Sequence, residues 1–174
     1  MFLSPIAGIV RLTQVFGVNR TTYAQFGLSG HNGLDLTGAE KGANVPLYSP
    51  IEGIVTEVGD EGKYGYGRYV RIRSIAPDDQ GRYKEVILGH LSSSAVWKGK
   101  FLYQLDSVGI SGGKPGTPGC GFSSGAHLHA GLRFLDSSFR VLNYNNGYKG
   151  YIDFLPYFRC WAQVEQKEAY LIQV

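Results

Sequence analysis

The 174-residue sequence has few of the features that mark membrane, disulfide-rich or nucleic-acid-binding proteins. No run approaches the roughly 20 apolar residues of a membrane span. Residues 1–5 lack the basic start of a signal peptide, and Arg11 interrupts the apolar residues early. The two cysteines, Cys120 and Cys160, allow at most one disulfide and have no Cys-x-x-Cys spacing. Lys and Arg form no basic block, and a net charge of +3 is too small to indicate nucleic-acid binding.

The composition indicates a turn-rich protein with one good hydrophobic core. At 174 residues and 43% hydrophobic content, the chain suits a single domain over residues 1–174 rather than two domains. It has 25 glycines and 12 tyrosines but few long apolar stripes at helical spacing, so we expect an all-β protein. The sequence shows no internal repeat, linker or low-complexity segment.

Local patterns predict where the chain is extended and where it turns. Strands are expected within residues 8–16, 45–58, 69–75, 83–91 and 127–134, with one or two short strands in 101–110. Residues 64–67 (Tyr-Gly-Tyr-Gly) are expected to connect a hairpin, and residues 112–125 to form a Gly/Pro/Ser-rich loop. One helical turn each is expected in residues 92–98 and 152–156. The tail over 137–174 has the weakest pattern.

All four histidines lie in segments with signals of their own. His127 and His129 are one residue apart on a predicted strand, so both imidazoles point to the same face. His31 precedes Asp35 by four residues, a spacing that puts both side chains on one side whether the segment is helical or extended. His90 ends a strand of buried character, a position well suited to face a groove.

These residues together predict a metal site, although a single histidine is most often an ordinary hydrogen-bonded residue. Catalytic zinc usually has three protein ligands in a tetrahedron and leaves the fourth position to water, and two histidines with one aspartate are a common set. His31, Asp35 and one of His127 and His129 would complete it. The sequence has no His-Glu-x-x-His motif to supply a glutamate base, so the remaining imidazoles are expected to handle the water proton.

Aromatic residues near these segments are candidates for contact with a substrate. Tyr23 and Phe26 either line a groove or pack locally, and the residues leave both readings open. Tyr23, Tyr64 and Tyr66 are the candidate substrate-binding residues.

The sequence resembles the lysostaphin/LytM-type zinc endopeptidases, which cleave peptide bonds in bacterial peptidoglycan. The resemblance covers nearly the whole chain and includes His31-x-x-x-Asp35, the 45–50 segment with Gly53, residues 64–67, Gly89-His90-Leu91, Ser124-Gly125-Ala126-His127-Leu128-His129 and residues 152–157. It implies a LytM-like fold of the duplicated-hybrid-motif type, an antiparallel β-sheet or sandwich with a narrow groove over one Zn²⁺ and few helical turns. It also implies that His31, Asp35 and His129 bind the metal, whereas His90 and His127 are catalytic.

Three departures from the family pattern are visible. Leu88 stands where tyrosine is common, Ala130 stands where phenylalanine is usual, and the loop over 112–125 is longer than typical. We expect them to affect substrate fit more than chemistry.

Other functions compete with a zinc endopeptidase. Gly121-Phe122-Ser123-Ser124-Gly125 matches the nucleophile elbow of serine hydrolases, but that motif requires a following helix and a later histidine, and none follows His129. A catalytically silent peptidoglycan-binding or regulatory module is a second alternative. The third is a structural, tail-associated part of a phage particle that also carries the enzyme.

The expected partners are peptidoglycan peptides, and phage tail proteins under the third alternative. The expected place of action is the cell wall, and the lack of a signal peptide predicts a phage-borne protein or a domain of a larger one.

Overall fold

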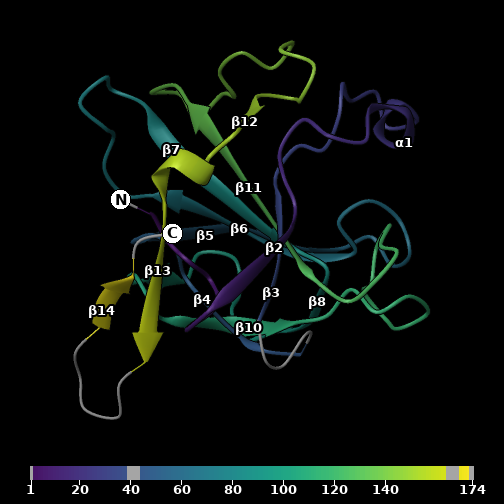
Figure 1. Ribbon diagram of the computed structural model, residues 1–174. Helices are drawn as coiled ribbons and strands as arrows, with labels where there is room; N and C mark the ends of the chain where they lie inside the picture. The colour runs from purple at the N-terminus through teal and green to yellow at the C-terminus, as the bar shows by residue number, and fades with distance from the viewer. Residues whose placement is uncertain (1, 39–43, 164–168, 173–174) are drawn as a thin grey trace.

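The computed structural model describes residues 2–38, 44–163 and 169–172 (Figure 1). Its regular structure is almost entirely strand. The helical elements in the described part are the five-residue helix α1 (Arg20–Ala24) and the 3₁₀ turn η1 (Leu155–Tyr157). Neither has the length and apolar character that a membrane-crossing helix requires.

A large antiparallel sheet forms the centre of the molecule, and its strands fan out across Figure 1. Its strands, in spatial order, are β2 (Val10–Gln14), β3 (Leu34–Gly38), β11 (Leu128–Leu135), β7 (Tyr83–Gly89), β6 (Arg68–Ser74), β5 (Gly53–Asp60) and β9 (Phe101–Leu102), with β12 (Tyr151–Ile152) paired to β11. All these neighbours pair antiparallel. The all-β, antiparallel fold predicted from the sequence is therefore confirmed.

Two small sheets complete the architecture. One has the order β4 (Pro46–Tyr48), β10 (Ser107–Ser111), β8 (Leu91–Ser94), and the other β1 (Phe2–Leu3), β13 (Phe158–Gln163), β14 (Ala169–Ile172). In the second, β1 runs parallel to β13. The β13–β14 hairpin lies at the lower left of Figure 1, and α1 lies at the upper right.

The hydrophobic core covers one face of the large sheet, because side chains alternate between the two faces of a strand. In β11, Leu128, Ala130 and Leu132 are buried in the core, whereas His129 and Arg133 lie on the opposite face. The same alternation holds in the neighbouring strands. Core residues there include Leu34, Leu36, Val70, Ile72, Val86 and Leu88, and the small sheets add Phe2, Leu47, Leu91 and Val108. The second face of the large sheet is therefore free to carry polar chemistry.

The hairpin prediction is confirmed, whereas one helix prediction is wrong. Residues 64–67 connect the antiparallel strands β5 and β6. Residues 92–98 do not form the expected helical turn, since residues up to Ser94 belong to β8, which pairs with β10. The hydroxyl of Ser92 donates to the carbonyl groups of Ile110 and Ser111 across that pairing.

Leu88 and Ala130, two of the departures from the family pattern, belong to the core. Their exposed fractions are 0% and 1%, and neither lines the site cavity described below. Strand alternation turns both side chains away from the face that carries the cavity, so their expected effect on substrate fit stays a prediction. Cys120 and Cys160 are both buried and are not joined in a disulfide.

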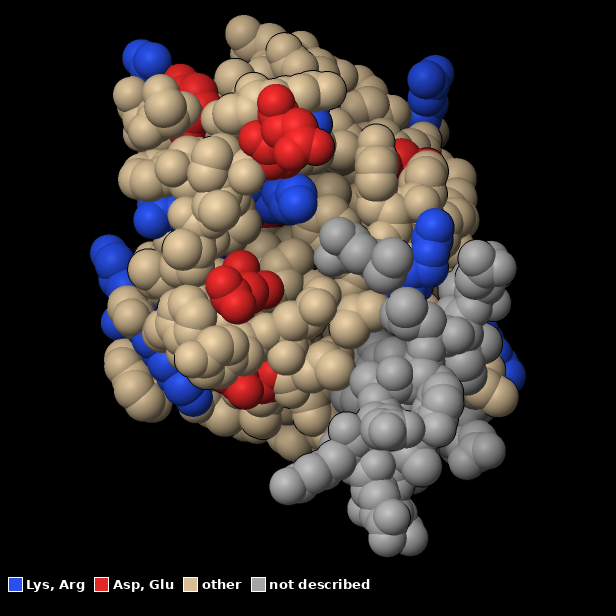
Figure 2. Space-filling model, turned by 90° about the vertical axis from the view of Figure 1, so that its left-hand side faces the viewer, with Lys and Arg blue, Asp and Glu red and all other residues tan. Residues whose placement is uncertain are grey.

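The surface carries charges of both signs. Figure 2 shows one face of the molecule, on which Lys and Arg side chains and Asp and Glu side chains are interspersed among other residues.

The core of β11 predicts a measurable stability effect. Leu132→Ala removes a side chain with 0% exposure, so we expect it to lower the free energy of unfolding by about 2–5 kcal/mol. Urea unfolding measures this value. Ile9→Ala, at a side chain that is 72% exposed, is the control and should change it by less than about 0.5 kcal/mol. Equal effects for the two variants would contradict the burial described here.

Candidate metal centre

The register of the large sheet brings three distant segments to one place. His129 of β11 lies opposite Asp35 of β3 on one side and opposite Gly89 of β7 on the other. His90 directly follows Gly89, and His127 directly precedes β11, where it pairs with Gly112 in an isolated bridge. His31 lies in the loop that leads into β3. A one-residue slip of any of these pairings would turn the side chains to the core, so the register defines the site.

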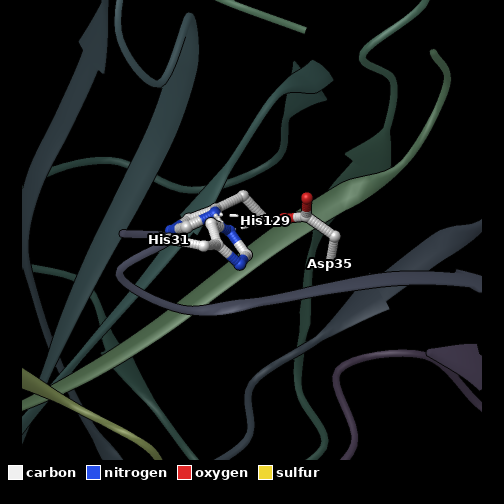
Figure 3. Close-up of side chains that lie close together, drawn as sticks. All are labelled: His31, Asp35 and His129. Atoms are coloured by element: carbon white, nitrogen blue, oxygen red, sulfur yellow. Dashed lines mark hydrogen bonds and ion pairs between the residues drawn. The ribbon is translucent and has the colours of Figure 1, made fainter. Parts of the chain in front are cut away.

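Three of these side chains converge on one point (Figure 3). The Nε2 atom of His31 lies 3.0 Å from the Nδ1 atom of His129 and 3.0 Å from an Asp35 carboxylate oxygen. The same oxygen lies 3.2 Å from His129 Nδ1. All three residues are buried. These are the three residues that the sequence resemblance predicts as metal ligands.

The donor set fits a zinc ion. Ligand atoms about 2.0–2.1 Å from a tetrahedral zinc lie roughly 3.3–3.4 Å from one another, close to the separations described above. Two imidazoles and a carboxylate are also ligands that zinc commonly takes in catalytic sites. The arrangement leaves the side toward the cavity for a fourth ligand.

Backbone carbonyl groups fix the orientation of two of the imidazoles. Nδ1 of His31 lies 3.1 Å from the carbonyl oxygen of Val15, and Nδ1 of His127 lies 2.7 Å from that of Gly125. A carbonyl oxygen only accepts, so Nδ1 carries the proton in each ring and Nε2 keeps a free electron pair. For His31 that electron pair points at the donor cluster, as a metal ligand requires.

His90 and His127 lie next to the cluster as a pair. Their ring centroids are 4.8 Å apart, and Nε2 of His127 lies 3.5 Å from the second carboxylate oxygen of Asp35. His90 is 5% exposed, and its Nδ1 atom has no hydrogen-bond partner in the described part of the chain. Its backbone is left-handed, with φ of 62°, where the chain passes from β7 to β8. Such a conformation is uncommon for a residue other than glycine.

The electrostatics keep this site in its unprotonated form near neutral pH. Burial lowers the pKa of His90 to about 3, helped by nearby His129 and His127. Burial also lowers the pKa of His129 to about 4, although its hydrogen bond to Asp35 opposes the shift. For Asp35, burial raises the pKa, but the contacts with the His129 and His31 side chains outweigh it and hold the pKa well below its usual range. Neutral imidazoles and an ionised carboxylate are the forms that bind a metal.

A cavity of about 750 Å³ opens over the cluster. Asp35, His90, His127 and His129 line it, and residues from α1, the 112–125 loop and the 142–152 segment complete its walls. Of the candidate substrate-binding residues, Tyr23 and Tyr66 line the cavity. Tyr64 does not, and it is 68% exposed.

Tyr23 and Tyr66 contact the histidine cluster directly. The ring of Tyr23 lies 5.2 Å from that of His31, and its hydroxyl accepts a hydrogen bond of 2.7 Å from Gln14. Burial raises the pKa of Tyr23 to about 12, with a further contribution from Asp35, so its hydroxyl stays protonated. The ring of Tyr66 lies 5.2 Å from that of His129. Both tyrosines thus present neutral hydroxyl groups close to the donor set.

Sequence reasoning missed several residues of the site. The hydrogen bond from His31 to the Val15 carbonyl could not be predicted from the sequence, because every residue has a backbone carbonyl group. Asn32 donates a 2.7 Å hydrogen bond to the Tyr66 hydroxyl, and its place directly after His31 was the available signal. Arg133 also lines the cavity, and the period-two spacing from His127 and His129 would have predicted its face.

Ser123 does not occupy a nucleophile elbow. A strand, β11, follows the motif, where the elbow requires a helix. Its hydroxyl lies 2.7 and 2.6 Å from the carbonyl oxygens of Gly113 and Gly125, so it holds the 112–125 loop together.

Comparison with known families decides which proteins this chain is related to. The family model described as peptidase family M23 matches residues 29–141, which include the four histidines and Asp35. The chain belongs to peptidase family M23. The sequence resemblance to lysostaphin/LytM-type enzymes is thereby confirmed. A search of curated protein sequences gave no match.

Solved structures with M23-like folds resemble the chain over most of its length. A zinc-containing peptidase from Vibrio cholerae matches with a TM-score of 0.60 and 21% identity, covering 87% of this chain and 38% of that one. The lysostaphin catalytic domain from Staphylococcus simulans matches with a TM-score of 0.55 and 20% identity, covering 88% of this chain and 86% of that one. A mutant form of the catalytic domain of the prophage-encoded M23 protein EnpA from Enterococcus faecalis matches with a TM-score of 0.57 and 20% identity. The match covers 83% of this chain and 96% of that one. At these identities the likeness shows the fold.

The close packing of Gly33 against a predicted ligand gives a test of the donor geometry. A Cβ at Gly33 would lie 2.5 Å from the Ala130 carbonyl oxygen and 2.8 Å from His129 Nε2. We expect Gly33→Ala to displace His129 and weaken zinc binding by at least about tenfold, as measured by competition with a chromophoric chelator. The control is Gly125→Ala, since nothing lies within 4 Å of the added Cβ. Unchanged affinity in Gly33→Ala would contradict the role of His129 as a ligand.

The pKa shifts predict how the stability of the metal-free M23 chain depends on pH. His90 and His129 have folded-state pKa values of about 3 and 4, below the ordinary value of 6.5. The unfolded chain therefore binds more protons as the pH falls below 6.5, and stability present at pH 7 is lost toward pH 4. At pH 5 the loss is roughly 2 kcal/mol for each histidine.

Urea unfolding in the presence of a chelator, at pH values from 7 to 5, measures this slope. His90→Gln should reduce it. A free energy of unfolding that does not change over this range would show that these imidazoles titrate normally.

Proposed function

We propose that this M23 chain is a zinc-dependent endopeptidase that hydrolyses peptide bonds in bacterial peptidoglycan. The observation that carries the proposal is the triangle of buried donor atoms from His31, Asp35 and His129, with sides of 3.0 to 3.2 Å. Asp35 and His129 line the cavity. His90 and His127 lie beside it, where a reacting water and a peptide carbonyl would meet. Membership of a peptidase family supports hydrolysis of a peptide bond.

His31, Asp35 and His129 are the residues that would hold the zinc ion. When bound, zinc lowers the pKa of water to about 7 and polarises a carbonyl group as a Lewis acid. Asp35 offsets part of the positive charge. The hydrogen bond to the Val15 carbonyl orients the His31 ring, since it holds the proton on Nδ1.

His90 and His127 would move the protons. At neutral pH the buried His90 ring is neutral, and the Nε2 atom of His127 carries an electron pair because Nδ1 donates to Gly125. Either imidazole can accept a proton from the attacking water and later give a proton to the leaving amine. Among the residues that the structure describes, Glu61 is the one glutamate that lines the cavity, and it accepts a hydrogen bond from the backbone amide of Tyr66. Imidazole is thus the proposed base.

Substrate and location follow from the family resemblance. Lysostaphin/LytM-type enzymes act on peptidoglycan, so the proposed substrate is a cross-bridge or stem peptide and the proposed place of action is the cell wall. A phage particle is one vehicle that would bring the protein there.

A catalytically silent module makes a different prediction from the enzyme. Degenerate relatives usually lack ligands, whereas all five site residues are present here. Zinc content together with the turbidity of a suspension of purified cell walls separates the two functions, since a silent module leaves the turbidity unchanged.

Substitution of the five site residues tests the division into ligands and proton carriers. We expect His31→Ala and Asp35→Ala to abolish both zinc retention and wall cleavage, because each removes one of three ligands. His90→Ala and His127→Ala should retain most of the zinc yet lower the cleavage rate by about 10² or more. Zinc is measured by metal analysis after dialysis, and cleavage by mass spectrometry of released peptides. Equal zinc loss in all four variants would show that the division is wrong.

A further inference from the structure

The cavity continues past the donor cluster along β11. His127, His129 and Arg133 all line it, since residues two or four apart on a strand share a face. Gly131, between His129 and Arg133 on this face, leaves room for the Tyr151 ring, because an added Cβ would lie 2.9 Å from that ring. The cavity therefore has a second end, which the proposed chemistry does not use.

Two arginines form the floor of this second end. Arg133 Nε donates a 2.6 Å hydrogen bond to Glu85, and Arg71 Nη1 lies 3.5 Å from the same carboxylate oxygen. Arg71 also donates to the Tyr151 hydroxyl at 2.7 Å and to Glu57 at 3.0 Å. Each guanidinium has five N–H donors, so both groups keep donors beyond those used in this network.

The network fixes both guanidinium groups in place. Side chains of Arg71 and Arg133 are each 15% exposed, and that of Glu85 is 9% exposed. The Arg133 guanidinium lies 5.2 Å from the centre of the Tyr151 ring. Side chains that are already fixed lose little conformational entropy when they bind a ligand. The two guanidinium groups therefore form a preorganised surface for an anion.

Cationic side chains outnumber acidic ones among the residues that line the cavity, whereas Glu57 and Glu85, which pair with the two arginines, are not lining residues. The cationic lining residues are Arg71, Arg133 and Lys149, and the acidic ones are Asp35 and Glu61. Asp35 belongs to the donor cluster, and Glu61 bonds to the Tyr66 backbone. Lys149 has no ion-pair partner in the described part of the chain.

We propose that Arg71, Arg133 and Lys149 form a subsite that binds a carboxylate group of the substrate peptide. The proposal rests on the proposed peptidase function and adds the class of substrate. Arginine forks bind carboxylates with two parallel hydrogen bonds, which gives orientation as well as attraction.

Strand geometry sets the distance between this subsite and the scissile bond. His129 and Arg133 are four residues apart in β11, which corresponds to roughly 13 Å at about 3.3 Å per residue. An extended peptide with its reacting carbonyl at the donor cluster would therefore place a carboxylate there about three to four residues away. Acidic stem peptides meet this requirement, whereas the interior of a neutral glycine cross-bridge does not.

The test compares two forms of one probe. The probe is an N-acetylated stem pentapeptide (Ala, γ-D-Glu, Lys, D-Ala, D-Ala) with free carboxylates, and its counterpart has every carboxylate amidated. We expect calorimetric titration of the metal-free protein to show about tenfold tighter binding of the acidic form, the size of one charged hydrogen bond. The zinc-loaded protein should show the same preference in kcat/KM. Equal affinity for the two forms would overturn the proposal.

Substitutions show which residues cause the preference for the acidic peptide over the amidated one. Lys149→Gln, at an exposed side chain, should reduce it without risk to the fold. The double variant Arg133→Gln with Glu85→Gln removes both members of the buried pair, and Arg71 keeps its contact with Glu57, so no unpaired charge remains. It should weaken the preference but not abolish it, because Arg71 and Lys149 remain. Lys98→Gln, at an exposed lysine outside the cavity, is the matched control and should leave it unchanged. A full preference in the double variant would place carboxylate binding elsewhere. A binding preference with no cleavage of either peptide would support the subsite and reject the peptidase function.

Discussion

The approach of two imidazole nitrogens and a carboxylate oxygen to within 3.2 Å of one another is the interaction on which the rest of the structure depends. All three atoms are electron-pair donors, and all three residues are buried. Such groups are stable together only with a shared proton or a cation. The remainder of the fold supplies the energy and the rigidity that hold them there.

The large sheet supplies this rigidity through its register. His129 has Asp35 across one pairing and Gly89 across the other, and the alternate residues Leu128 and Ala130 are packed in the core. The core therefore fixes which face the imidazole occupies. Backbone carbonyl groups then fix the rotation of His31 and His127, so the polar site depends on apolar packing beneath it.

Much of this arrangement was predictable from alternation alone. Leu128 and Ala130 around His129 indicate a strand with one polar face, and the structure contains that strand. The spacing of His31 and Asp35 fits a helix or a strand, so β3 was not predicted. The helical turn expected at residues 92–98 is absent because residues 91–94 pair with β10, and local sequence does not reveal that pairing. The Val15 carbonyl and the Arg71–Glu85–Arg133 network depend on which strands are neighbours. Local sequence patterns do not show which strands will be neighbours in a sheet, so these contacts could not be predicted.

The left-handed backbone of His90 has one more consequence. This residue is the corner at which a continuous chain leaves the large sheet, as β7, and enters the sheet of β8. Its amide donates a 2.8 Å hydrogen bond to the carbonyl group of Tyr66, whose own ring packs near His129. The backbone that carries this imidazole is therefore held by two sheets at once, so the position of the ring depends on how the two sheets pack together.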